Sequence, residues 1–194
     1  YLCHVARSNL DLALKVKLNF LDGIVFPDIC DVVHILPDIW SFHNPMPFQH
    51  TLIVAGKFNS ASSQRYLINQ FNELRKSLRK FTGRDISDND LRQSIIVYNQ
   101  DRDLMLSLYQ MRMENPGIFT ARDVATAVMA SMLMPKEEHT TLMQELLEKA
   151  MLKEKRLDGR IRLIISGSPC DQPEWGILDL IEELGATVVN DDLY

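Results

Sequence analysis

Three cysteines are the residues best suited to metal-binding chemistry, and they stand at positions 3, 30 and 170. Cys3 and Cys30 share a context, because each lies at or just before the start of an expected helix. Free backbone N–H groups and the helix dipole favour a thiolate there, and the thiolate is the form that binds a metal. Their separation of 27 positions is unlike the compact spacing of zinc modules and small ferredoxins. Residue type and spacing alone therefore favour two buried structural cysteines over two metal ligands.

A histidine accompanies each of these two cysteines. His4 directly follows Cys3, and His34 lies four positions after Cys30. Either imidazole could hydrogen-bond a sulfide of a metal cluster or carry a proton, and either could simply pack beside its cysteine. The sequence therefore assigns neither histidine a catalytic role, and the catalytic residues stay unknown.

The composition narrows the class of protein around these residues. The 194 residues are 46% hydrophobic and 24% charged, as in an ordinary globular protein. Twenty-one Lys and Arg against 26 Asp and Glu give a net charge of -5 without a basic block, so we expect no nucleic-acid partner. No apolar stretch approaches the eighteen or so residues that cross a bilayer, so we expect no membrane partner. An odd number of widely spaced cysteines favours a reducing compartment and a cytoplasmic location.

The elements that must position Cys3 and Cys30 alternate between helix and strand. Residues 8–17 have the periodicity of a helix, and Ile24–Phe26 reads as a short buried strand. A second helix should follow Cys30 and be interrupted or bent at Pro37. Residues 51–54 are the next strand. This alternation predicts a parallel sheet.

The middle of the chain is predicted to be mostly helical. Apolar residues four and three apart, ended by Gly83, indicate an amphipathic helix over residues 62–81. Thr120 and Asp123 have the spacing of a capping box, and Pro135 suits the start of a helix to about residue 157. Between the helix at residues 62–81 and Thr120, we expect a helix from Ser87 to Arg112. One stripe along this helix is made by Leu91, Ile95, Tyr98, Arg102, Met105 and Leu108.

Near its end the chain is again predicted to alternate between strand and helix, with strands at 160–166 and 186–189 around a helix at 174–184. We therefore predict an α/β fold of parallel-sheet, Rossmann-like layers with a large helical region between them. Because the chain starts without Met and stops just after a strand, we expect a fragment of a longer two-domain subunit. Residues 1–58 would be part of a first α/β domain, 59–158 the helical region, and 159–194 the truncated start of a second α/β domain.

Longer runs of sequence carry a family resemblance. They are Leu2-Cys3-His4-Val5-Ala6-Arg7-Ser8, then residues 19–31 with the pattern "FLDG-strand-P-x-x-CD", and the segments at 82–87, 98–102, 135–138 and 185–193. Together, in order along the whole chain, they resemble the benzoyl-CoA reductase / 2-hydroxyacyl-CoA dehydratase subunit family.

The resemblance implies an oxygen-sensitive heteromeric enzyme whose subunits hold a [4Fe-4S] cluster with three cysteine ligands. Cys3 and Cys30 match the first two ligand positions. The third is expected outside this chain, so a cluster here would be absent or incomplete. Cys170 matches no family ligand and is expected to be a loop cysteine without a metal role. An iron without a protein thiolate leaves a coordination position open to substrate or solvent.

The resemblance also implies partners: a homologous second subunit, an ATP-dependent iron–sulfur activator that donates a low-potential electron, and an acyl-CoA substrate. The family catalyses two types of reaction, reduction and dehydration. The sequence segments "FPDICD" and "DDLY" are more similar to the reductase branch, an oxidoreductase that reduces an aromatic acyl-CoA thioester. The alternative is a lyase, an (R)-2-hydroxyacyl-CoA dehydratase with a ketyl-radical mechanism. An alternative of another class is a non-catalytic subunit or scaffold domain in which all three cysteines are structural.

Overall fold

The computed structural model describes residues 2–57, 59–152, 159–167 and 175–192. Its contacts divide the chain into two compact units, Tyr1–Ser87 and Asp88–Tyr194, and each is described by itself. The first unit contains α1 (His4–Leu14), β1 (Gly23–Asp28), α2 (Asp31–His43), β2 (Phe48–Ile53) and α3 (Ala61–Thr82). The second contains α4 (Asp88–Glu114), α5 (Ala121–Leu133), α6 (Lys136–Met151), β3 (Ile161–Ile165), α7 (Trp175–Glu183) and β4 (Ala186–Asp191).

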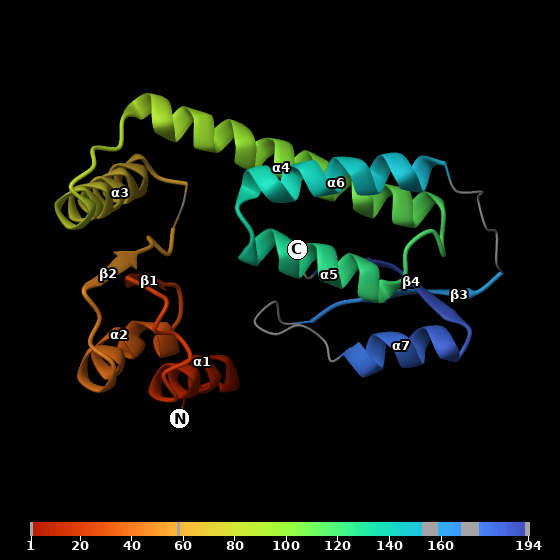
Figure 1. Ribbon diagram of the computed structural model, residues 1–194, viewed down its shortest axis with the longest axis horizontal. Coiled ribbons are helices and arrows are strands. Elements are labelled where there is room, and N and C mark those ends of the chain that lie inside the picture. Colours follow the sequence, from red (N-terminus) through yellow and green to blue (C-terminus); the bar gives the residue numbers. More distant parts are fainter. Residues whose placement is uncertain (1, 58, 153–158, 168–174, 193–194) are drawn as a thin grey trace. The chain divides into compact units, whose positions relative to one another are not determined.

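The first unit is built on a parallel pair of strands joined through a helix. β1 and β2 pair from Gly23 opposite Phe48 to Asp28 opposite Ile53. Helix α2 packs on β1, and α3 packs on β2 (Figure 1). A side chain at Gly23 would clash with Phe48, because a Cβ there would lie 2.6 Å from the Phe48 Cβ. The close approach of the two strands thus requires glycine at the start of β1.

Helices α1 and α2 share one hydrophobic cluster with β1. Its buried members are Ala6, Ala13, Phe26, Leu36 and Trp40. The Phe26 and Trp40 rings meet edge to face with centroids 5.7 Å apart, an arrangement that adds to the stabilisation from burying their surface. This cluster fixes α1 against α2 and both helices against the sheet.

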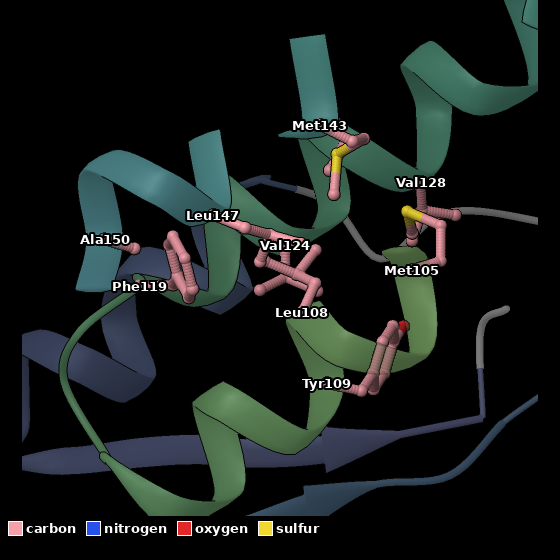
Figure 2. Packing of buried hydrophobic residues seen from close by; sticks show 10 residues of the cluster. Met105, Leu108, Tyr109, Phe119, Val124, Val128, Met143, Leu147 and Ala150 are labelled. Carbon is pink, nitrogen blue, oxygen red and sulfur yellow. The ribbon is translucent and has the colours of Figure 1, made fainter. Parts of the chain in front are cut away.

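The second unit combines a parallel strand pair with a group of three helices. β3 and β4 are parallel and connected through α7, which packs on β4 and on α5. Helix α4 runs alongside α6 and also contacts α5 and β4 (Figure 1). The three helices enclose the main core, to which α4 contributes Met105, Leu108 and Tyr109, α5 contributes Val124 and Val128, and α6 contributes Met143, Leu147 and Ala150 (Figure 2).

A buried polar group joins the same three helices. Asp101 of α4 is fully buried, and its carboxylate accepts a hydrogen bond of 2.6 Å from Lys136 Nζ at the start of α6. The other carboxylate oxygen is hydrogen-bonded to Nδ1 of the buried His139. His139 Nε2 donates to the Ala127 carbonyl of α5 at 3.1 Å. The polar atoms that burial removes from water are thereby paired with one another.

A second buried polar group ties α4 to β4. The Arg112 side chain is 1% exposed; its Nε donates to the Val188 carbonyl at 2.6 Å and its Nη1 to Asp191 at 2.7 Å. The Tyr109 hydroxyl donates to the same carboxylate at 2.5 Å. Two side chains one turn apart on α4 therefore hold the carboxyl end of β4.

The α/β class and the parallel strand pairing predicted from the sequence are confirmed. The predicted helix after Pro135 ends at Met151 rather than near residue 157, and residues 153–158 lie outside the described part of the chain. Pro37 does not interrupt α2, which continues to His43. The division at residues 58 and 158 concerns domains of a longer subunit and stays a prediction. None of the helices in the described residues combines the length and the apolar character that crossing a membrane requires.

Candidate functional site

Cys3 is the N-cap residue of α1. Its backbone is extended (φ -62°, ψ 162°), and its carbonyl accepts the Arg7 N–H at 3.0 Å, which closes the first turn. Its side chain makes no capping hydrogen bond, and the thiol is free and exposed. The thiol thus lies beside the first-turn N–H groups of the helix, where negative charge is favoured.

Cys30 occupies the same position on α2. Its backbone is also extended (φ -158°, ψ 162°), and its carbonyl accepts the His34 N–H at 2.9 Å. This thiol too is free, exposed and without a capping hydrogen bond. The placement of both cysteines at helix starts is confirmed, whereas the burial expected of purely structural cysteines does not occur.

The two helix starts belong to one packed region. Leu2, which precedes Cys3, and Val32 and Val33, which follow Cys30, all pack against the cluster of α1, α2 and β1. Among the residues that the structure describes, no three His, Cys, Asp or Glu side chains gather as a complete metal site. This region therefore offers two exposed thiols on two helices in contact, fewer than a closed metal site requires.

A pocket of about 540 Å³ lies where β1 and β2 end, at the start of α2. Ligands of open α/β sheets bind outside the carboxyl ends of the parallel strands. Ile29, Val54 and Ala55 are its apolar lining residues; its other lining residues are Asp28, Cys30, Asp31, His34 and Gly56. The pocket is thus part apolar and part polar, with a thiol among its polar groups.

The polar residues that line this pocket include a carboxylate–imidazole pair. His34 Nδ1 donates to Asp28 Oδ2 at 2.9 Å; the Asp28 side chain is 17% exposed and that of His34 70%. The hydrogen bond to Asp28, followed by the negative charge of the same carboxylate, raises the pKa of His34 above its usual value. The pair fixes one ring nitrogen and leaves Nε2 as the other polar atom of the ring.

The sequence drew attention to His34 but not to its partner. Asp28 closes β1 and His34 lies one turn into α2, so the strand-to-helix turn folds the two together. A carboxylate at the end of a strand, followed by a helix that starts with Cys, is the signal that could have found the pair. Cys170, predicted to be a loop cysteine without a metal role, lies outside the described residues.

Comparison with known proteins identifies the family. The family model described as 2-hydroxyglutaryl-CoA dehydratase, D-component, matches residues 1–194. The chain belongs to this family. The resemblance seen in the cysteine-containing segments is therefore confirmed over the whole chain.

The individual relatives include both reductase and dehydratase subunits. The chain is 34% identical, over 99% of its length, to a benzoyl-CoA reductase subunit of Thauera aromatica. It is 26% identical, over 99% of its length, to the beta subunit of (R)-2-hydroxyglutaryl-CoA dehydratase of Acidaminococcus fermentans. It is 25% identical, over its full length, to the beta subunit of lactoyl-CoA dehydratase of Anaerotignum propionicum. In each case it covers 50% of the relative, so the chain spans about half the length of these proteins.

Proposed function

We propose that this chain is part of the iron–sulfur subunit of an ATP-dependent, benzoyl-CoA reductase-like enzyme that passes low-potential electrons to an aromatic acyl-CoA thioester. The observation that carries the proposal is the 34% identity to the benzoyl-CoA reductase subunit, against 22–26% to the dehydratase subunits. These figures cover nearly the same residues of the chain, so they compare the two branches directly. They favour the reductase, and the subunit would be an oxidoreductase component.

In this proposal Cys3 and Cys30 supply two of the three ligands of a [4Fe-4S] cluster. The structure is compatible with that role, because both thiols are exposed, unbonded and placed at the N-termini of helices that contact each other. The third ligand belongs to the part of the longer protein that this chain lacks. When bound, the cluster supplies one-electron transfer at low potential. The role of the chain is to hold two irons through thiolates and to line the adjoining pocket.

The same proposal includes partners and a location. The relatives are named as subunits, which supports a homologous second subunit in the assembled enzyme. An ATP-dependent iron–sulfur activator would donate the electrons, an acyl-CoA would be the substrate, and the enzyme would be cytoplasmic. No residue is assigned a catalytic role in this scheme.

A second candidate is an (R)-2-hydroxyacyl-CoA dehydratase subunit, a lyase. The description of the family and the dehydratase subunits among the relatives favour it. Both candidates use the same cluster ligands, so Cys3 and Cys30 keep their proposed role in either. Turnover of benzoyl-CoA against 2-hydroxyglutaryl-CoA by the assembled enzyme distinguishes the two.

The decisive experiment is anaerobic iron and sulfide reconstitution of the full-length subunit, followed by iron counting and EPR. We expect about four irons per subunit in the wild type and a loss of the cluster in Cys3→Ala and in Cys30→Ala. Cys170→Ala is the matched control and should keep the full iron content. No iron in the wild type, or full iron in both cysteine variants, would refute the cluster role and leave the non-catalytic scaffold as the working hypothesis.

A further inference from the structure

The pocket beside Cys30 has the chemistry of a site for an acyl thioester. Its apolar lining residues Ile29, Val54 and Ala55 suit a hydrocarbon acyl group, and His34 lines the same pocket as a polar residue. Its volume of about 540 Å³ lies within the range of roughly 300–1,000 Å³ that small-molecule sites occupy. Gly56 also lines the pocket, and among the described residues no atom lies within 4 Å of where its Cβ would stand.

The direction of the His34 side chain follows from its helix. Side chains on a helix lean toward its N-terminus, so a residue at i+4 lies over the residue at i. Cys30 and His34 have this spacing at the start of α2, and both line the pocket. The bond from Nδ1 to Asp28, which precedes the helix, shows that the ring has this direction.

The Asp28 carboxylate also decides which ring atom is available. A carboxylate that accepts Nδ1–H fixes the orientation of an imidazole and leaves Nε2 for the group that the histidine serves. The ring lines the pocket and is largely exposed, so Nε2 can be reached by a bound molecule. The arrangement therefore has an oriented polar atom beside a thiol and an apolar surface.

We propose that His34, oriented by Asp28, is a positioning residue for the substrate, and that its Nε2 contacts the thioester group of an acyl-CoA bound in the pocket beside Cys30. This inference rests on the proposed function for the class of ligand. It adds a substrate contact that lies on the cysteine-bearing helix itself.

The test measures binding of benzoyl-CoA by anaerobic calorimetry to the assembled full-length enzyme, with iron counted in every sample. We expect His34→Leu to weaken binding at least tenfold with an unchanged iron content. His34→Gln, which keeps a polar atom, should recover part of the loss, and Asp28→Asn should weaken binding less than His34→Leu.

His43→Leu is the matched control, because His43 is an exposed histidine at the other end of α2. It should bind benzoyl-CoA as the wild type does. The proposal is wrong if His34→Leu binds as tightly as the wild type, or if it loses iron together with binding, since His34 would then support the cluster. A wild type without iron, or cysteine variants with full iron, would instead contradict the proposed cluster, so the two failures are distinguishable.

Discussion

At the scale of single residues, the Asp28–His34 pair is the part of the site in which a carboxylate changes the protonation of a histidine. Both partners lie next to Cys30, and the ring is largely exposed. The hydrogen bond to Asp28 and the negative charge of that carboxylate favour the protonated ring, so the pKa of His34 is raised above 6.5. The ring therefore stays protonated to a higher pH than an isolated histidine.

This raised pKa gives a direct prediction. In Asp28→Asn the pKa of His34 should fall toward its ordinary value, because both the hydrogen bond to a carboxylate and its negative charge are lost. An NMR titration of the His34 ring protons between pH 5 and 9 measures the change. An unchanged His34 midpoint in Asp28→Asn would contradict the assigned cause.

The residues of the site were predictable to different degrees. The helix-start positions of Cys3 and Cys30 follow from local periodicity, and the structure bears them out. Their exposure does not follow from residue type, because free cysteine is more often buried. The pairing of Asp101 with His139, 38 positions apart, depends on how α4 and α6 pack, and no local pattern contains that information.

At the scale of elements, helix α5 shows how a short capping motif in the sequence stabilises the start of a helix. Its N-cap Thr120 accepts the Asp123 N–H at 3.0 Å, and the Asp123 carboxylate accepts the Thr120 N–H at 2.9 Å. This is the capping box that the Thr and Asp spacing predicted. It satisfies N–H groups that the first turn of the helix cannot bond internally.

Removal of the cap gives a prediction for the element. Thr120→Ala should lower the free energy of unfolding by about 1 kcal/mol, because an N–H group of the first turn loses its acceptor. The control is Thr126→Ala, an exposed threonine on the same helix, for which we expect a change within about 0.5 kcal/mol. Urea unfolding followed by circular dichroism measures both. Equal losses for the two variants would show that the cap contributes nothing specific.

The buried group around Asp101 connects three helices and makes their packing sensitive to acid. Burial alone would raise the pKa of Asp101, but the hydrogen bonds from Lys136 and His139 outweigh it and lower the pKa. A carboxyl group with a lowered folded-state pKa stabilises the protein above its ordinary pKa of about 4. That stabilisation is lost as the pH falls from there through the lower folded-state value.

We therefore predict that Asp101→Asn destabilises the protein at neutral pH and that the difference from wild type shrinks in acid. Loss of one partner of a buried ion pair costs roughly 3–5 kcal/mol, and the lower end applies because Lys136 retains 14% exposure. Urea unfolding at pH 7 and at pH 3 measures the difference. Asp103→Asn, an exposed carboxylate on the same helix, is the control and should change little at either pH. A difference that grows in acid would contradict the assignment.

The limits of the helix patterns are visible in α4. The predicted stripe on this helix includes Leu91, Ile95 and Tyr98, yet every buried residue of α4 lies at Asp101 or beyond. Periodicity predicts that a helix has an apolar face. It does not predict which turns of that face another element covers, because coverage depends on elements distant in the sequence. The class of fold, the strands and most helix starts could therefore be predicted from the sequence. How much of each apolar helix face is covered by other elements could not.

At the scale of the whole molecule, each unit contains a parallel strand pair joined through a helix, and the pair in the first unit ends at the pocket beside Cys30. A two-stranded parallel sheet is smaller than the sheets usual in α/β proteins. The chain also spans half the length of its relatives. In the proposed function, the three-cysteine cluster likewise takes one ligand from outside these residues.

The proposed cluster, with two of its three ligands in this chain, predicts how the 194-residue chain behaves on its own. After anaerobic reconstitution it should hold fewer than four irons and catalyse no acyl-CoA turnover, because the described residues offer two thiols and no group of three metal ligands. Iron and sulfide analysis, EPR and an acyl-CoA assay beside the full-length subunit measure this. Any iron that the chain does retain should be lost in Cys30→Ala and kept in Cys170→Ala. A stable four-iron cluster with turnover in the 194-residue chain would show that it holds a complete site, and the third ligand would then have to be sought within this sequence.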